Sequence, residues 1–405
     1  MYKLKVGIPI AEYDIHGGGS FSYATQLTEA IDDYNFSSQL EIVFIDFTGK
    51  KENKFNKSLL SFHPFKKFSF NDALRKIVIQ FLKKVKINAF KKILYRCENN
   101  HALKRNKYIA KKLKQEEISV LFYITPGGND FDYPFLTTHW DIGHRSTYMF
   151  PEFIDSFDYR EYYYASHLKK ALYILTETYT GKKELIKYTK INEDRIDVMP
   201  IFPSTVIYEE VGTDSQIQFL DKVEITSKKF FLYPAQFWGH KNHTLLIDAF
   251  SRISYRELGI KLVFTGSDKG NLGYIKKYVS TNSIQDYVIF LGFVSNKELY
   301  TLYKNAAALV MPTYLGPSNM PPLEAANLGC PVIISDLEGH REIMGDYAEY
   351  FKTNDVDELK DKLVKVLTLP KEQPKYLLKT FNIENTIKCL EKSLINIIPI
   401  RKTWE

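Results

Sequence analysis

Cysteine is scarce in this sequence, and its three cysteines lie far apart. Cys97, Cys330 and Cys389 are odd in number, and none stands at metal-ligand spacing from another. This arrangement argues against a disulfide framework and against a zinc site. We therefore expect a protein of a reducing compartment, the cytoplasm.

Long apolar runs are also lacking. No stretch approaches the ~18 to 20 apolar residues that a membrane-spanning helix requires. The short apolar run in the N-terminal MYKLKVGIPIAEYD predicts a first strand and not a signal peptide. Hydrophobic residues still make up 44% of the 405 residues, and a chain of this length exceeds the usual size of one core. The sequence predicts a soluble chain of two domains of roughly 200 residues each.

Acidic residues are rare between residues 50 and 114, where three of them stand among twenty Lys or Arg residues. Because the whole chain carries +7, this local balance of +17 leaves −10 for the other residues. Within the segment, residues 78–93 predict an amphipathic helix whose basic face includes Lys83, Lys84 and Lys91. An anionic surface at the inner face of the cell membrane would bind such a helix, and a helix packed on its own domain with solvated lysines is the alternative. Nucleic acid is not expected, because no nucleic-acid-binding motif accompanies the charge.

Strand-like and helix-like segments alternate along the chain in two series, a pattern typical of α/β domains with mostly parallel sheets. The expected strands lie at residues 5–10, 40–47, 120–124, 135–138, 171–176, 197–200, 230–234, 261–266, 288–291, 309–312 and 330–335. The expected organisation is an N-terminal domain over 1–205, a linker over 206–228, a second domain over 229–383, and a C-terminal helix over 384–405 that packs back on the N-terminal domain. Ligands bind such sheets at the carboxyl ends of the strands, so we expect the site in the cleft between the domains.

The most informative stretch runs from Leu309 to Asp336 and predicts a strand, a loop, a helix, a turn and a second strand. Ser318 or Asn319 suits the N-cap of the helix, two prolines suit its first turn, and Gly329 suits its left-handed end. The free N–H groups of such a helix start and its partial positive charge favour a phosphate.

Glu324 lies one turn into this helix, beside the predicted phosphate site. Its carboxylate would accept hydrogen bonds from uncharged groups attached to the phosphate, such as the hydroxyls of a ribose. A simple favourable interaction with the positive helix terminus is the alternative.

Other candidate residues also stand at predicted strand ends. Lys241 lies at the start of a helix, where an ammonium group is unfavourable unless an anion such as a diphosphate offsets it. The glycine turn at residues 17–20 and the stretch 263–267 would let a ligand approach the backbone. Asp141 and His144 lie three apart on one loop, where they would either converge on a sugar hydroxyl or hold each other in position.

In this order, the segments resemble the retaining, nucleotide-sugar-dependent glycosyltransferases of family 4, whose GT-B fold has two facing Rossmann-like domains. The resemblance covers most of the chain, and it is strongest from Tyr233 to Asp336. There, residues 236–242, 264–267, 291–299 and 321–325 stand in family order. The stretch Gly-Pro-Ser-Asn-Met-Pro-Pro-Leu-Glu resembles a variant found among bacterial surface-polysaccharide transferases.

The resemblance implies a role for each matching residue. Lys241 would hold the donor diphosphate, Glu324 would hold the ribose, and the loop with Asp141 and His144 would face the transferred sugar. The implied donor-binding residues are Gly18, Gly19, Gln236, Gly266, Ser267, Phe293, Val294, Leu299, Ser318, Asn319 and Met320.

Three positions depart from the family pattern. Gly316 stands where the family usually has a second glutamate, Gln236 stands in place of a common arginine, and Trp140 stands in place of the histidine directly before the loop aspartate. Each departure removes a group that would contact the sugar or the phosphates.

The implied reaction moves a hexose or deoxyhexose, with retention, from a nucleoside diphosphate sugar to a glycan or lipid-linked oligosaccharide acceptor in the biosynthesis of a capsule, an O-antigen or a similar polysaccharide. No cofactor and no metal are expected, because a lysine and a helix terminus serve the phosphates and no Asp-x-Asp pair stands at a strand end. The alternatives are a non-catalytic subunit that binds a glycan or a partner protein, and a sugar-nucleotide epimerase.

Overall fold

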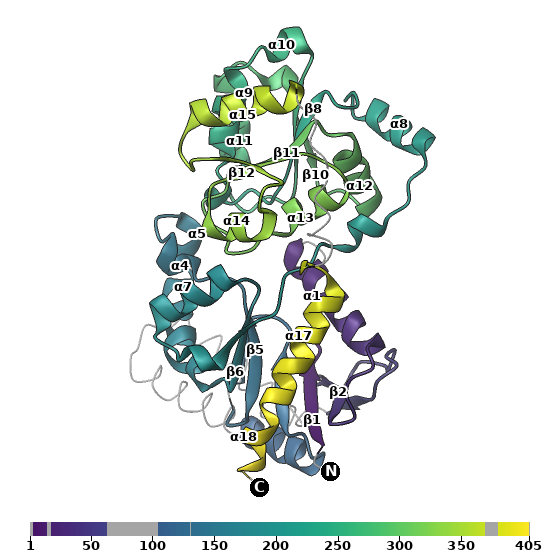
Figure 1. Ribbon diagram of the computed structural model, residues 1–405, viewed down its shortest axis with the longest axis vertical. Coiled ribbons are helices and arrows are strands. Elements are labelled where there is room, and N and C mark those ends of the chain that lie inside the picture. The colour runs from purple at the N-terminus through teal and green to yellow at the C-terminus, as the bar shows by residue number, and fades with distance from the viewer. Residues whose placement is uncertain (1–2, 14–17, 63–103, 130, 369–379, 405) are drawn as a thin grey trace, which may run out of the picture.

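The computed structural model describes residues 3–13, 18–62, 104–129, 131–368 and 380–404, and it contains two α/β domains that face each other (Figure 1). Each domain is built on one parallel β-sheet with helices packed on it. This architecture confirms the predicted fold. The basic helix predicted at residues 78–93 and Cys97 lie outside the described residues.

The described part of the first sheet has seven strands in the order β3-β2-β1-β4-β5-β6-β7, and all neighbouring pairs are parallel. The strands are β1 (Leu4–Pro9), β2 (Leu40–Asp46), β3 (Leu59–Ser61), β4 (Val120–Tyr123), β5 (Phe135–His139), β6 (Tyr173–Thr176) and β7 (Ile196–Val198). The α-helices of this domain are α1 (Gly19–Asp33), α4 (Gly143–Ser146), α5 (Pro151–Ile154), α6 (Phe157–Tyr162) and α7 (Tyr179–Thr189). Strands such as β5, in which every residue is buried, are typical of parallel sheets covered on both faces.

The second sheet has six strands in the order β10-β9-β8-β11-β12-β13 among the described residues, again all parallel. The strands are β8 (Phe230–Pro234), β9 (Lys261–Thr265), β10 (Val288–Gly292), β11 (Ala308–Met311), β12 (Val332–Ser335) and β13 (Glu349–Phe351). The α-helices are α9 (His243–Ser251), α10 (Tyr255–Leu258), α11 (Leu272–Thr281), α12 (Asn296–Asn305), α13 (Met320–Asn327), α14 (Glu338–Met344) and α15 (Val356–Thr368). The sequence analysis missed the three-residue edge strands β3 and β13, although it found β7, which has the same length and also lies at an edge.

Residues 206–228, predicted as a linker, contain the helix α8 (Thr213–Lys222), which follows the 3-10 turn η5 (Thr205–Tyr208). Leu220 of α8 is buried, and Gln216 accepts a hydrogen bond of 2.8 Å from the side chain of Asn305 at the end of α12. This part of the chain therefore packs on the second domain.

The C-terminal helices are α17 (Ile383–Asn396) and α18 (Ile398–Lys402), and they return to the first domain (Figure 1). Glu391 of α17 accepts hydrogen bonds from the hydroxyl of Tyr34, at 2.9 Å, and from the backbone N–H of Ser37. Leu390 and Leu394 are fully buried on the apolar face of α17. The tail thus ties the last residues of the chain to the first helix.

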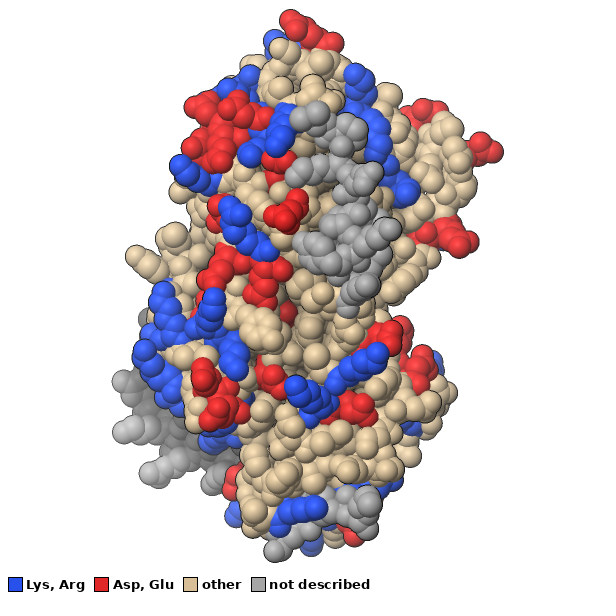
Figure 2. Space-filling model, viewed as in Figure 1, with Lys and Arg blue, Asp and Glu red and all other residues tan. Residues whose placement is uncertain are grey.

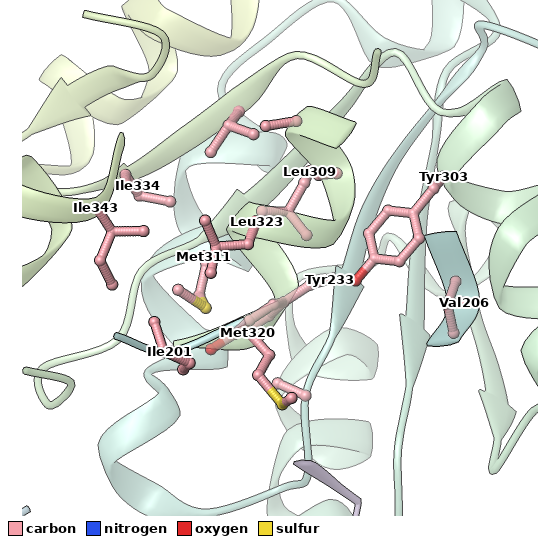
Figure 3. Close-up of a cluster of buried hydrophobic side chains, with 14 of the residues drawn as sticks. Ile201, Val206, Tyr233, Tyr303, Leu309, Met311, Met320, Leu323, Ile334 and Ile343 are labelled. Atoms are coloured by element: carbon pink, nitrogen blue, oxygen red, sulfur yellow. The ribbon is translucent and has the colours of Figure 1, made fainter. Parts of the chain in front are cut away.

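Buried apolar side chains hold the start of α13 in place. Figure 3 shows Met320 and Leu323 of α13 in one buried cluster with Met311 of β11, Tyr233 and Tyr303. Leu323 is 0% exposed and Met320 is 7% exposed. Because this packing leaves little freedom, the first turn of α13 has a defined position relative to the sheet.

Each helix among the described residues falls short of the length and apolar character that a membrane span requires. On the face drawn in Figure 2, acidic and basic side chains are interspersed over both domains.

Candidate functional site

A cavity of about 920 Å³ lies between the two domains. Its walls come from the loops that follow β1, β5 and β6 in the first domain and β8 to β11 in the second. These loops stand at the carboxyl ends of parallel strands, where such sheets bind ligands. The volume suits a ligand of the size of a nucleotide with an attached group.

The cavity brings together all but one of the predicted site residues. Those that line it are Lys241, Glu324, Asp141, Gly18, Gly19, Gln236, Gly266, Ser267, Phe293, Val294, Leu299, Ser318, Asn319 and Met320. The first-domain glycine turn faces the second domain directly, since Gly18 lies beside the amide of Gln236 and Gly19 beside the sulfur of Met320.

His144 is the exception, because it is fully buried behind the cavity wall. Its Nε2 lies 2.8 Å from Oε1 of Glu161, and its ring stacks on Tyr164 with 5.1 Å between ring centroids. Asp141 has different partners: its Oδ1 accepts hydrogen bonds from Nη1 of Arg160 at 3.0 Å and from the N–H of Gly143 at 2.8 Å. Neither alternative predicted for this pair is seen: Asp141 lines the cavity, His144 packs behind its wall, and each has other hydrogen-bond partners.

Lys241 lies at the end of the short turn η6 (Gly239–Lys241), and its side chain enters the cavity. Its Nζ donates a hydrogen bond of 3.2 Å to Oδ1 of Asn319. Burial lowers the pKa of Lys241 to about 8, although the negative charge of Asp141 acts in the opposite direction. Within the described part of the chain, no carboxylate lies at ion-pair distance from this ammonium group. An anion in the cavity would supply the missing charge partner.

Asn319 is the residue before α13, but its side chain does not cap the helix. Instead, its Nδ2 lies 3.1 Å from Nε2 of His340, whose Nδ1 lies 2.7 Å from the carbonyl oxygen of Ser335. That carbonyl only accepts, so Nδ1 carries the proton and Nε2 accepts from Asn319. Burial lowers the pKa of His340 to about 4, which keeps the ring neutral. His340 therefore orients the amide so that its oxygen faces Lys241, and the Asn319 side chain does not cap the helix. Because Pro321 and Pro322 have no N–H, the first turn of α13 offers the N–H groups of Met320 and Leu323.

Gly316 has a positive φ of 155°, and a Cβ built at this position would lie 1.8 Å from Nδ2 of Asn319. The amide of Asn319 thus occupies the space that a side chain at residue 316 would need. The departure from the family pattern at this position is coupled to the placement of Asn319.

Glu324 is buried, with 5% of its surface exposed, and it already has two partners. Its Oε2 accepts a hydrogen bond of 2.7 Å from the hydroxyl of Tyr303, and its Oε1 accepts one of 3.3 Å from the N–H of Ser204. Burial raises the pKa of Glu324. The side chain of Ser204 also contacts this carboxylate. A carboxylate has about four acceptor positions, so these contacts still leave capacity for a ligand.

Four charged residues of the cavity were missed by the sequence analysis, and one of them is Glu29 of α1. Glu177 follows β6, and Arg160 and Glu152 belong to α6 and α5. An acidic residue directly after a buried strand was the available signal for Glu177, because strand ends meet at the cleft. Arg160 and Glu152 lie in short helices whose exposed and buried residues follow no clear period, so the sequence carried no comparable signal for them.

Carboxylates join the two domains at two places. Glu152 of the first domain accepts hydrogen bonds from the backbone N–H of His240, at 2.9 Å, and from its Nδ1, at 2.6 Å. At the second place, Glu342 of α14 accepts hydrogen bonds from the N–H groups of Tyr179 and Thr180, at 2.7 and 2.8 Å, at the start of α7. The cleft is thus held closed by carboxylates that span the interface.

Among the described residues, no group of three or more His, Cys, Asp or Glu side chains is arranged to hold a metal ion.

Two facing parallel α/β domains with a cavity at their strand ends define the GT-B fold. The solved structures agree with this class. A glycosyltransferase from Rickettsia africae has a TM-score of 0.63 at 15% identity, with 99% of this chain and 98% of that chain covered. Anabaena HepE in complex with UDP-glucose has a TM-score of 0.62 at 11% identity, with 96% and 99% covered.

Residues 215–379, which make up most of the second domain, match the family described as glycosyl transferases group 1. The O-antigen chain mannosyltransferase RfbU of Salmonella typhimurium is 27% identical over 204 residues, which are 50% of this chain and 53% of the relative. The O-antigen chain mannosyltransferase B of Escherichia coli is 25% identical over 225 residues, which are 55% and 58% of the two chains. The matched region spans about half the length of these curated relatives.

Proposed function

We propose that this chain is a retaining glycosyltransferase that moves a hexose or deoxyhexose from a nucleoside diphosphate sugar to a glycan or lipid-linked acceptor in the biosynthesis of a surface polysaccharide. The observation that carries the proposal is the contact of Lys241 with Asn319 at the start of α13, inside the cavity between the domains. The group 1 domain and the O-antigen mannosyltransferase relatives support it.

The diphosphate of the donor would bind between Lys241 and the first turn of α13. The ammonium of Lys241 lies in the cavity wall, and the start of α13, with the N–H of Met320, adds partial positive charge. The ribose would then lie near Glu324, which keeps acceptor capacity for a ligand. UDP-glucose is the ligand of HepE, which has the same fold, and this is a further reason to propose a nucleoside diphosphate sugar.

Stabilisation of the leaving group would dominate the reaction. Negative charge grows on the diphosphate while the bond from the anomeric carbon to the phosphate oxygen breaks. Loss of one such donor typically costs about 3–4 kcal/mol of transition-state stabilisation. We assign no enzyme nucleophile. The acceptor oxygen would attack from the same face of the sugar, and a donor phosphate oxygen would take the proton of the acceptor hydroxyl.

The test is a panel of nucleoside diphosphate sugars incubated with the purified protein, with membrane extract as the source of acceptor. Nucleotide release and a product that keeps the anomeric configuration, seen by NMR, are expected. Activity should persist in EDTA, because the proposal assigns the phosphate charge to Lys241 and the α13 terminus. Absence of turnover with every donor would favour a non-catalytic subunit, and interconversion of the sugars would favour an epimerase.

Peripheral contact with the membrane is a separate part of the proposal, and it rests on the charge of residues 50–114. A lipid-linked acceptor at the inner face of the cell membrane would place the substrate beside this basic segment. Co-sedimentation with anionic liposomes is expected. If binding persists after Lys83, Lys84, Lys91 and Lys92 are changed to Glu, these residues have no such role.

A further inference from the structure

Glu177 is a buried acid that faces the cavity without a cationic partner among the described residues. It stands directly after β6, and 6% of its surface is exposed. Its Oε2 accepts a hydrogen bond from the hydroxyl of Ser318, which belongs to the opposite domain. Among the described residues, no other group forms a hydrogen bond with this carboxyl group. Its remaining hydrogen-bonding positions therefore face the cavity.

The charged and titratable surroundings of Glu177 favour a neutral acid. Burial and the nearby negative charge of Asp141 raise the pKa of Glu177 to about 8, and the Ser318 hydrogen bond offsets only part of this. Asp141 itself stays ionised, because Arg160 and the N–H of Gly143 hold its pKa below the usual value despite burial. Tyr23 of α1, the other titratable group that senses Glu177, is neutral because burial raises its pKa. Two carboxyl groups of one cavity thus have different protonation states, which allows them different roles.

We propose that Glu177 binds a hydroxyl group of the hexose carried by the donor and so contributes to the choice of sugar. This inference rests on the proposed function. The phosphates find their positive partners in the second domain, at Lys241 and the start of α13, whereas Glu177 belongs to the first domain. Next to a diphosphate, an ionised carboxylate would be repelled, while a neutral carboxylic acid can donate to one hydroxyl and accept from another.

The contact with Ser318 places this acid beside the loop that leads into the phosphate site. Ser318 is followed directly by Asn319, the partner of Lys241. A sugar attached to a diphosphate at Lys241 would therefore lie within the region that Glu177 faces. The sugar, and not the nucleotide, is the part of the donor that this residue distinguishes.

The experiment compares the binding of donors with and without their sugar. Dissociation constants are measured by calorimetry for UDP and UDP-glucose, and for GDP and GDP-mannose, with the full chain and the variants Glu177→Gln and Glu177→Met. Glu177→Met keeps the side-chain volume but removes the hydrogen bonds. This variant should bind UDP-glucose or GDP-mannose about tenfold more weakly and should bind UDP and GDP as the unaltered protein does. Glu177→Gln keeps a neutral donor and acceptor and should retain most of the affinity.

A matched control is available on the adjacent helix. Glu184 of α7 is also partly buried, and burial together with Asp141 raises its pKa to about 7, but it does not line the cavity. Glu184→Met should leave all four dissociation constants unchanged. Intact binding of the bare diphosphate shows that each variant is folded.

The outcomes separate the inference from the proposed function. If Glu177→Met weakens the binding of the nucleoside diphosphate and of its sugar donor equally, or weakens the binding of neither, the sugar contact is refuted while the proposed function stands. If Glu177→Gln loses as much affinity for the sugar donor as Glu177→Met, the role of a neutral hydrogen-bonding group is refuted. If the unaltered protein binds no nucleoside diphosphate sugar of the panel, the proposed function fails, and this inference fails with it.

Discussion

Lys241 and Asn319 join the two second-domain loops that meet in the cavity, through a hydrogen bond of 3.2 Å from Nζ to Oδ1. Behind them, His340 holds the amide of Asn319 in one orientation, because its own Nδ1 is committed to the carbonyl of Ser335. The ammonium group is therefore held in place before any ligand arrives. Such preorganisation is what a site for a leaving diphosphate needs.

The first prediction concerns the positive charge of this pair. Lys241→Ala should lower kcat/KM for the sugar donor at least ~100-fold, on the scale of a lost oxyanion donor. Steady-state kinetics with the donor found in the panel would measure the effect. Lys222→Ala, at the exposed end of α8, is the control and should behave as the unaltered protein. A near-normal kcat/KM for Lys241→Ala would contradict the proposal that Lys241 binds the donor diphosphate.

The second prediction follows from the pKa of Lys241, which burial lowers to about 8. At pH 9 most of the free protein has a neutral Lys241, and a bound diphosphate raises the pKa again because it stabilises the charged form. Binding at pH 9 should therefore take up a proton, whereas binding at pH 6.5 should involve little uptake at this residue. Calorimetry of UDP or GDP binding in buffers of different ionisation enthalpy measures the proton count.

Lys241→Arg is the matched variant for this experiment, since arginine stays protonated throughout the range. Its proton uptake at pH 9 should be smaller than that of the unaltered protein, and any remainder belongs to other groups such as Glu177. Equal uptake by both proteins would show that Lys241 is already charged in the free cavity.

The third prediction concerns the glycine at residue 316. Gly316→Ala should displace the amide of Asn319, because the added Cβ would lie 1.8 Å from its nitrogen. We expect a loss of kcat/KM on the order of 10- to 100-fold, since small displacements of binding groups have effects of this size. Gly316→Glu should be no better, although it restores the residue type that the family usually has. Unchanged activity in either variant would mean that the loop accommodates a side chain.

Gly329→Ala provides the control for backbone strain in this prediction. Gly329 also has a positive φ, of 73°, but an added Cβ would meet nothing within 4 Å. This variant should lose some thermal stability and keep its activity.

The fourth prediction concerns the contact between the domains at the start of α7. Glu342→Ala removes the acceptor of two backbone N–H groups and of the Thr180 hydroxyl, which lies at 2.8 Å. Because hydrogen bonds to a charged group contribute about 1.5–3 kcal/mol, their loss should shift the domains toward an open arrangement. Small-angle X-ray scattering should show a larger radius of gyration, and the donor KM should rise.

Glu338→Ala on the same helix is the matched comparison. Glu338 pairs with Lys183 across the interface, but both side chains are mostly exposed. Exposed ion pairs contribute little, so this variant should keep the closed dimensions. A similar increase in the radius of gyration of both variants would show that the loss of negative charge, and not the loss of the hydrogen bonds at the start of α7, separates the domains.

Much of the fold could be predicted from the sequence, because strand and helix periods are local properties. The strands around Phe230, Lys261 and Val332 were found by their apolar runs, and the start of α13 was found from its two prolines and the loop before it. Strands of three residues carry little periodicity, so β7 was found while the equally short edge strands β3 and β13 were missed. The helix α8 was missed because its sequence is mixed in polarity.

The candidate site also has one part that could be predicted from the sequence and one part that could not. The sequence by itself determined that Lys241, Glu324 and the glycine turns stand at strand ends or helix starts, and parallel sheets bring such positions to one cleft. Only the tertiary structure decided that His144 turns to Glu161 and not to Asp141, that His340 orients Asn319, and that Glu177 faces the cavity from the other domain. These outcomes depend on contacts between residues distant in the chain, where packing and burial decide which polar groups meet and which protonation states they take.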